Sequence, residues 1–267
     1  MEDKVLGGTM KNRDDVIVKL KPFLTEHPKT LAVWEGGSAA TNTLDAYSDL
    51  DILIVAERHD TETLLNAIDA FFEKQFGVIE SMRMPEPTWH GFAQKFYHLA
   101  NTEPWLYVDL CVMPPTVDDG FTAPDRHGLG VVWKDTIDFI KPAPTPHEMI
   151  KQRAAAHYAR ATQGSFILRL EIEKAFRRNH YLDAYQFMHG YIMRHVVPLT
   201  NIEHRIAKVD FGIRYADRDY APEDYQLLVR FFRASSLEAL KGLSIELFNR
   251  FEALKAKHEG KCKKTSN

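Results

Sequence analysis

The chain has 267 residues, of which 45% are hydrophobic, so it can bury the core of one large domain or of two modest ones. Its formal net charge of −3 at pH 7 provides no overall basic field, which disfavours proteins that coat nucleic-acid backbone. Cys111 and Cys262 are the only cysteines and lie far apart, which excludes a disulfide framework and a cysteine zinc site.

The first half of the chain alternates helix and strand patterns. Residues 11–24 carry apolar side chains at helical spacing, and residues 31–34 form a short apolar run that stops at Gly36-Gly37-Ser38. Residues 50–56 are a dense β-type run, and an amphipathic helix that Gly77 ends comes next. Further strands are expected at 78–83, 92–100 and 105–113, the last two forming an antiparallel hairpin around the turn 101–104.

The second half of the chain has the pattern of a helical protein. Residues 114–146 are rich in Pro, Gly and Asp, with one strand-like island at 131–133, which is typical of a loop leading to a linker. Amphipathic helices are then expected at 147–178, 181–197, 222–232 and 235–258. We predict an α+β fold with a small mixed β-sheet domain over 1–141, a C-terminal helical bundle over 147–258 and a basic tail over 259–267.

Two aspartates occupy alternate positions at the start of the run 50–56. Because side chains of a strand alternate in direction, Asp49 and Asp51 should share one face while Leu50 and Ile52 take the other. Two carboxylates held side by side repel one another unless a cation lies near them, and a hard divalent ion such as Mg²⁺ suits them best. Asp49 could instead be a plain turn residue, whereas Asp51 lies inside an apolar run and needs a partner there.

Two further features extend this carboxylate pair. Gly37-Ser38 ends a strand and should open a short helix, so that backbone N–H groups and the serine hydroxyl can face phosphate oxygens. Asp109 lies in another apolar strand-like run, where an unpaired charge would be destabilising. There it could complete a site for two metal ions. The alternatives are an edge strand that faces water for Asp109 and an ordinary turn for Gly36-Gly37.

The ordered combination of Gly37-Ser38, a spacer, Asp49-Leu50-Asp51 and a later strand aspartate, Asp109, resembles the nucleotidyltransferase superfamily typified by DNA polymerase beta. The resemblance covers roughly residues 31–113. A compact catalytic domain followed by a helical bundle is also similar to the antibiotic nucleotidyltransferases that adenylylate aminoglycosides and lincosamides.

The resemblance implies a metal-dependent enzyme that moves a nucleoside monophosphate from an NTP, expected to be ATP, onto a hydroxyl of a small-molecule acceptor and releases pyrophosphate. It implies that Asp49, Asp51 and Asp109 are catalytic residues that bind two Mg²⁺ ions, and that Gly37 and Ser38 cradle the phosphates. The position of Asp109 also suits a base for the acceptor hydroxyl.

Some small-molecule adenylyltransferases of this superfamily add a further acidic base, for which Glu171, Glu173 or Asp183 are the candidates in the helical half. The segment Asp210–Tyr215 has the look of a motif without an evident role. A triphosphate also needs basic partners, and the candidates near the first domain are Lys95, Arg126, His127 and Lys134.

Two other functions remain open alongside the small-molecule transferase. One is a protein adenylyltransferase. The other is a catalytically idle, antitoxin-like module that has the nucleotidyltransferase fold and acts by binding, against which the presence of all three aspartates argues.

The cellular compartment and the kinds of partner are predicted from targeting, membrane and zinc-binding patterns that we do not find in the sequence. Residues 1–15 hold no apolar leader, and no apolar run reaches the roughly 18 residues that a membrane span needs. The 12 histidines show no close pair on one face of the kind that binds zinc. We therefore expect a cytoplasmic protein that acts on an NTP and a small molecule, without membrane or nucleic-acid partners.

Overall fold

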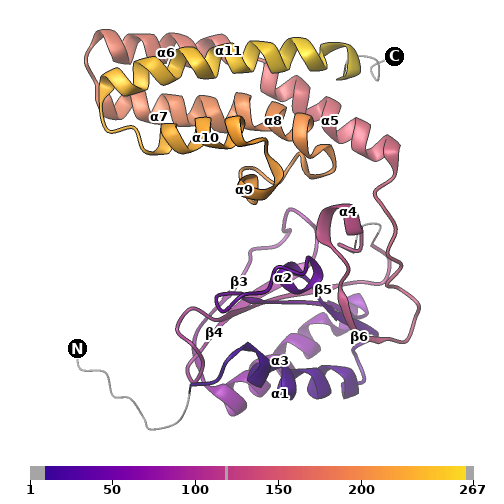
Figure 1. Cartoon of the computed structure of the whole chain (residues 1–267). Coiled ribbons are helices and arrows are strands. Elements are labelled where there is room, and N and C mark those ends of the chain that lie inside the picture. The colour runs from indigo at the N-terminus through magenta and orange to yellow at the C-terminus, as the bar shows by residue number, and fades with distance from the viewer. Residues whose placement is uncertain (1–9, 118–119, 263–267) are drawn as a thin grey trace, which may run out of the picture. The chain divides into compact units, whose positions relative to one another are not determined.

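The computed structural model describes residues 10–117 and 120–262, which form two compact units. The first unit extends to Pro144 and the second begins at Thr145 (Figure 1). A mixed sheet in the first unit and helices throughout the second confirm the predicted α+β class. None of the described helices is both long and apolar enough to cross a membrane.

The first unit is built on one six-stranded sheet with the strand order β3-β4-β5-β2-β1-β6. Strand β2 pairs with β5 in parallel, and every other neighbouring pair is antiparallel, including the expected hairpin of β4 and β5. The strands are β1 (Ala32–Glu35), β2 (Leu50–Val55), β3 (Val78–Arg83), β4 (Ala93–Leu99), β5 (Tyr107–Met113) and β6 (Val131–Asp135).

The two faces of this sheet differ in what covers them. Helices α1 (Arg13–Glu26) and α3 (Thr61–Phe76) lie against one face (Figure 1). Leu50, Ile52 and Ile54 of β2 point into the core beneath these helices, because apolar side chains gain about 25 cal/mol for each Å² they remove from water. The alternation of the strand therefore turns Asp51 to the opposite face, where the short helices α2 (Gly37–Ala40) and α4 (Pro124–His127) lie.

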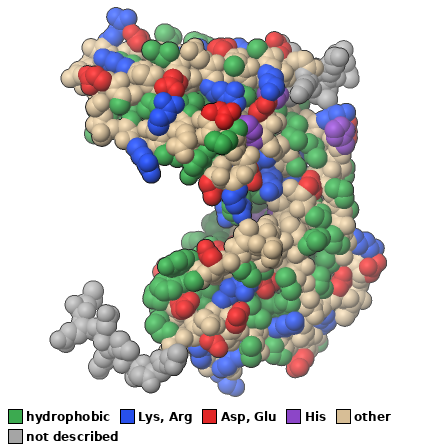
Figure 2. Space-filling model, viewed as in Figure 1, with side chains coloured by type: hydrophobic (Ala, Val, Ile, Leu, Met, Phe, Trp, Pro, Cys, Tyr) green, Lys and Arg blue, Asp and Glu red, His purple; other side chains and the backbone are tan. Residues whose placement is uncertain are grey.

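The second unit is a bundle of helices around one apolar core, in which Tyr191, Phe231 and Phe251 are almost completely buried. On the face that Figure 2 shows, cationic and anionic side chains are interspersed over its surface. Its helices are α5 (His147–Thr162), α6 (Ser165–Arg177), α7 (Tyr181–Tyr191), α8 (Val197–His204), α9 (Ala216–Asp219), α10 (Pro222–Phe232) and α11 (Leu237–Cys262).

Three details of the bundle differ from the sequence-based expectation. The single helix expected over 147–178 is wrong, because Gly164 adopts a left-handed conformation (φ +69°) and separates α5 from α6. The helix expected to end at 197 continues through a π-helical turn, Ile192–Val196, into α8, whose Pro198 cannot donate a backbone hydrogen bond. The expected tail over 259–267 begins inside α11, and its last five residues lie outside the described part.

The segment Asp210–Tyr215 is held by a buried polar network. The amide of Asn201 donates to the backbone oxygens of Val209 (3.1 Å) and Gly212 (3.0 Å). Arg205, of which 8% is exposed, donates to the oxygens of Gly212 and Arg214 and forms an ion pair with Asp219 (2.9 Å). Buried carbonyl groups need such donors, so the sequence pattern of this segment serves to fix the connection between α8 and α10.

Replacing Arg205 by Ala should destabilise the second unit by about 3 kcal/mol, because two carbonyl groups and Asp219 lose their donor. Urea unfolding followed by far-UV circular dichroism reports mainly on the helices of this unit. The four tryptophans, residues 34, 89, 105 and 133, all lie in the first unit, so the transition in their fluorescence should not move. Replacing the exposed Arg233 by Ala is the matched control and should change stability by less than about 0.5 kcal/mol. Equal stability of the two variants would contradict the structural role of Arg205.

Candidate active site

Asp51 and Asp109 are brought together by the parallel pairing of β2 with β5. The two residues are direct partners in the register, and neighbouring strands lie about 4.8 Å apart. Asp49 directly precedes β2, in a loop rather than in the strand, and stands opposite Tyr107 when the same register is continued. The three aspartates singled out in the sequence therefore gather at the start of two adjacent strands, on the sheet face that α1 and α3 leave uncovered.

The glycine turn after β1 packs directly against Asp51. The backbone N–H of Gly36 donates to the backbone oxygen of Asp51 at 2.9 Å. Gly37 has a φ of +54°, and a Cβ added to it would overlap the carboxylate of Asp51. Glycine is needed at position 37 for both reasons, the left-handed backbone and the close approach of a carboxylate.

Ser38 is the second residue of the short helix α2 and carries a hydroxyl group. Its Oγ is buried, and within the described residues it has no hydrogen-bond partner. A buried hydroxyl without a partner costs about 1–3 kcal/mol, so a group that bonds to it would recover this free energy. The end of α2 is fixed by the loop after α4, since the N–H of Leu129 donates to the oxygen of Ala40 at 2.9 Å.

Asp49 lies beside Tyr107 and Arg13. Burial, the larger cause, together with the nearby carboxylate of Asp49 raises the pKa of Tyr107, so the phenol keeps its proton. From the other side, Nε of Arg13 donates to the backbone oxygen of Asp49 at 3.3 Å, and the same guanidinium forms an ion pair with the buried Glu35.

Asp109 is half-buried and accepts hydrogen bonds from a neighbouring strand. The side-chain amide of Gln94 donates to both of its oxygens, at 2.8 and 3.0 Å. Burial is the main cause that raises the pKa of Asp109, and the charge of Asp49 adds to this rise, while the hydrogen bond from Gln94 opposes it. Cys111, on the same strand, has its pKa raised by burial, so its thiol is not an activated nucleophile.

Gln94, Tyr107 and Arg13 are parts of the site that sequence reasoning missed. The alternation of β4 does point to Gln94. Apolar residues occupy most of the positions of this strand that face the helices, and Gln94 lies on the other face, diagonal to Asp109. This contact could be predicted only if the pairing register of β4 and β5 were known, because a slip of one residue would turn Gln94 to the opposite face.

The chemistry of the donors suits a hard cation, although each carboxylate is turned toward a protein group. Within residues 10–117 and 120–262, no three His, Cys, Asp or Glu side chains converge as a ready metal site. Carboxylate oxygens and a serine hydroxyl are, however, the ligands that Mg²⁺ prefers, and Ser38 Oγ has no partner of its own among the described residues. The residues present therefore fit a divalent cation.

The basic candidates differ in where they lie. Lys95 points to the helix-covered face of the sheet and forms an ion pair with Asp69 of α3 (2.6 Å), so the expectation that it could serve a triphosphate is wrong. Lys134 lies on the edge strand β6, opposite Val33. Arg126 and His127 belong to α4, whose following loop contacts α2, and they are therefore on the same face as the aspartates.

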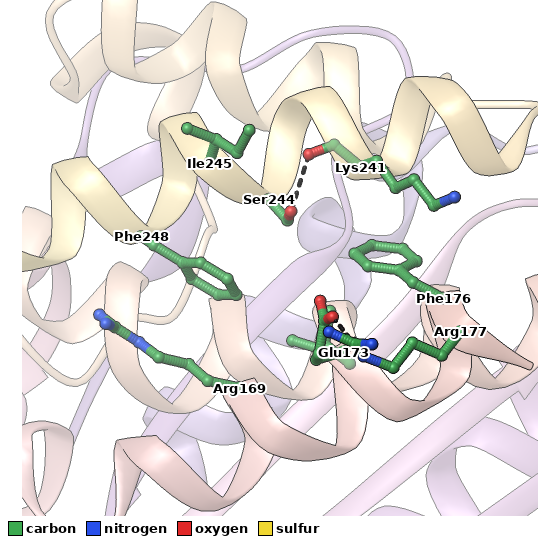
Figure 3. Close-up of a pocket in the computed structure, with 9 residues that line it drawn as sticks. Arg169, Glu173, Phe176, Arg177, Lys241, Ser244, Ile245 and Phe248 are labelled. Atoms are coloured by element: carbon green, nitrogen blue, oxygen red, sulfur yellow. Dashed lines mark hydrogen bonds and ion pairs between the residues drawn. The ribbon is translucent and has the colours of Figure 1, made fainter.

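The acidic candidates of the bundle form pairs along their own helices. Glu171 accepts a hydrogen bond from Lys174 (2.7 Å), and His180 pairs with Asp183 (3.2 Å). Glu173 pairs with Arg177 (2.7 Å) at the edge of a pocket of about 400 Å³ between α6 and α11 (Figure 3). These contacts are those of a solvated helix surface.

Replacing Gly37 by Ala should destabilise the first unit by about 2 kcal/mol or more, because alanine disfavours the left-handed conformation and its methyl group overlaps the carboxylate of Asp51. Unfolding followed by tryptophan fluorescence measures this unit alone. Gly242, which lies in α11 with open space around it, is the matched control. Its replacement by Ala should leave the fluorescence transition in place and stabilise the bundle by up to about 1 kcal/mol. A Gly37 variant of wild-type stability would contradict this packing.

Residues 17–93 of the chain match the model of the nucleotidyltransferase domain family. This stretch includes Gly37, Ser38, Asp49 and Asp51 and ends just before Gln94, so Asp109 lies outside it. No curated protein matches the chain. The match supports the resemblance of the first unit to the nucleotidyltransferase superfamily typified by DNA polymerase beta, and with it the transfer of a nucleoside monophosphate in general terms.

Proposed function

We propose that this protein transfers a nucleoside monophosphate, AMP from ATP, to a hydroxyl group of a small-molecule acceptor and releases pyrophosphate. The observation that carries the proposal is the in-register pairing of Asp51 with Asp109, with Gly37 packed on Asp51. This arrangement places two carboxylates beside a glycine turn that leads to Ser38, whose hydroxyl has no partner among the described residues, within the family-matched stretch or next to it.

Asp49, Asp51 and Asp109 would hold the divalent cations, which we take to be two Mg²⁺ ions. When bound, the cations neutralise charge on the phosphates and on the attacking oxygen. Gly37 and Ser38 bind phosphate oxygens through their backbone N–H groups and the Ser38 hydroxyl, which needs a partner. Arg126 and His127 are the basic groups whose position on this sheet face suits the triphosphate.

Asp109 has the properties of a proton acceptor for the incoming hydroxyl. Its pKa is raised chiefly by burial, and a carboxylate of higher pKa is the stronger base. The amide of Gln94 donates to this group and favours its charged form. The proton of the acceptor hydroxyl passes to Asp109 while the acceptor oxygen bonds to the α-phosphorus and the bond to pyrophosphate breaks.

A small-molecule acceptor is favoured by the charge distribution of the protein. The formal net charge is −3, and the visible surface carries mixed charges, whereas a nucleic-acid acceptor needs a basic field. The presence of all three aspartates, each with a protein donor or a close packing partner, favours a working enzyme over an idle binding module. Activity on antibiotics of the aminoglycoside or lincosamide kind is one case of this proposal, and a protein hydroxyl is the alternative acceptor.

Replacing Asp51 by Asn should abolish the Mg²⁺-dependent part of nucleotide binding, because the amide keeps the shape of the carboxylate but not its charge. Isothermal titration with non-hydrolysable ATP, CTP, GTP and UTP analogues, with and without Mg²⁺, measures this effect and identifies the donor base. Asp138, which is 83% exposed and has a φ of +55°, accepts Asn without strain and is the matched control.

Pyrophosphate release on a panel of hydroxyl compounds, including aminoglycosides and lincosamides, then identifies the acceptor class. The Asp51→Asn variant should release pyrophosphate at least about a hundredfold more slowly, while Asp138→Asn keeps the wild-type rate. A wild-type protein that binds none of the four nucleotides would refute the proposed transfer and leave the binding-module alternative.

A further inference from the structure

We propose that Gln94 and His90 form a positioning relay that sets the orientation of the Asp109 carboxylate. The effect of this relay on catalysis rests on the proposed function, whereas its geometry is formed by the side chains of the protein without a substrate. It runs from the turn that precedes β4, along the first residues of that strand, to the carboxylate on β5.

The first step of the relay is the contact between Gln94 and Asp109. The side-chain nitrogen of Gln94 lies 2.8 Å from one carboxylate oxygen and 3.0 Å from the other. A single NH₂ group thus occupies one position on each oxygen. An ionised carboxylate has about four lone-pair positions, so each oxygen keeps a second one for a cation or for the proton of an acceptor. Gln94 therefore fixes the direction of the carboxylate without blocking it.

The second step fixes which way the amide of Gln94 points. Its side-chain oxygen lies 3.2 Å from Nε2 of His90. The other ring nitrogen, Nδ1, lies 3.1 Å from the backbone nitrogen of Phe92 and 3.2 Å from the hydroxyl oxygen of Thr88. We assign the tautomer from the first contact: the N–H of Phe92 donates to Nδ1, so the ring proton is on Nε2 and is donated to the oxygen of Gln94. An amide turned the other way would set its oxygen against Asp109 and its NH₂ group against an N–H donor, which are two repulsive contacts.

The third step is the rigidity of the turn that carries His90. The hydroxyl of Thr88 donates to the backbone oxygen of Phe92 at 2.6 Å, and the N–H of Gly91 donates to the oxygen of Thr88 at 3.1 Å. The ring of His90 contacts those of Phe92 (centroids 4.8 Å apart) and Phe121 (5.9 Å apart). A ring held by two aromatic neighbours and by its own turn has little freedom, so it can define the orientation of the groups that follow.

The segment from Thr88 to Gln94 therefore orients the carboxylate of Asp109. Asp109 lies alone between apolar neighbours on β5, and no donor from its own strand reaches it among the described side chains. Losing Gln94 would let the carboxylate rotate away from the position that it shares with Asp51. Outer partners of this kind typically change activity by about 10- to 100-fold when they are removed.

The test uses the full-length protein and three variants. Gln94→Leu removes the donor, Gln94→Glu keeps the shape but replaces the donor by a like charge, and His90→Phe keeps the ring but removes Nε2–H. His59→Phe, at a side chain that is 78% exposed, is the matched control for the histidine change. Unfolding by urea, crystal structures without ligand, nucleotide affinity by titration and pyrophosphate release are measured for each.

We expect Asp109 to adopt a second rotamer in both Gln94 variants and pyrophosphate release to fall at least about tenfold, with nucleotide affinity within about threefold of the wild type. His90→Phe should give a smaller fall of the same kind, because the amide is then free to turn, and His59→Phe should give none. If Gln94 had only a structural role, its replacement would lower the stability of the protein and would not reduce the rate of pyrophosphate release more than the nucleotide affinity.

Two results would overturn the relay. One is an Asp109 carboxylate that keeps a single, unchanged position in Gln94→Leu and Gln94→Glu, and the other is wild-type pyrophosphate release by both variants. If the wild type binds Mg²⁺ and nucleotide but these variants behave like it, the relay fails while the transferase stands. If no nucleotide binds, the transferase fails, and the position of Asp109 in the variant structures alone decides the relay.

Discussion

The parallel pairing of β2 with β5 is the constraint on which the site depends. Its register places Asp51 beside Asp109 and, on the other face of the sheet, Leu50, Ile52 and Ile54 in the core under α1 and α3. A slip of one residue would bury the carboxylates and expose these apolar side chains, which would cost several kcal/mol. Hydrophobic burial on one face therefore fixes the geometry of the charged groups on the other.

The carboxylates are held in place by protein groups before any ligand arrives. Gln94 donates to Asp109, Arg13 donates to the backbone oxygen of Asp49, and Gly37 allows the carboxylate of Asp51 to approach the turn after β1. The hydrogen bond from Gln94 lowers the cost of keeping a carboxylate in a partly buried place. Such prior alignment is worth more to a transfer reaction than flexible ligands, because the reacting atoms need not be ordered during the reaction.

The two units solve the burial of polar groups in different ways. The first unit gathers its polar residues on the sheet face opposite α1 and α3, beside a smaller apolar cluster that includes Leu53 and Val55. The second unit uses Asn201 and Arg205 to satisfy carbonyl groups inside the bundle, which explains the pattern of Asp210–Tyr215 without a ligand. A motif-like sequence can thus reflect a local hydrogen-bonding need, and its position in the fold separates this case from an active site.

Local patterns in the sequence were sufficient to predict most helices and strands, the α+β class and a functional role for Asp51. The reason is that strand alternation and helical spacing depend only on residues that are near in the sequence. The partner of Asp51, the role of Gln94 and the displacement of Lys95 to the opposite face were decided by the tertiary structure. Each depends on which strands pair and in which register, and that is set by the burial of the whole core rather than by any single segment.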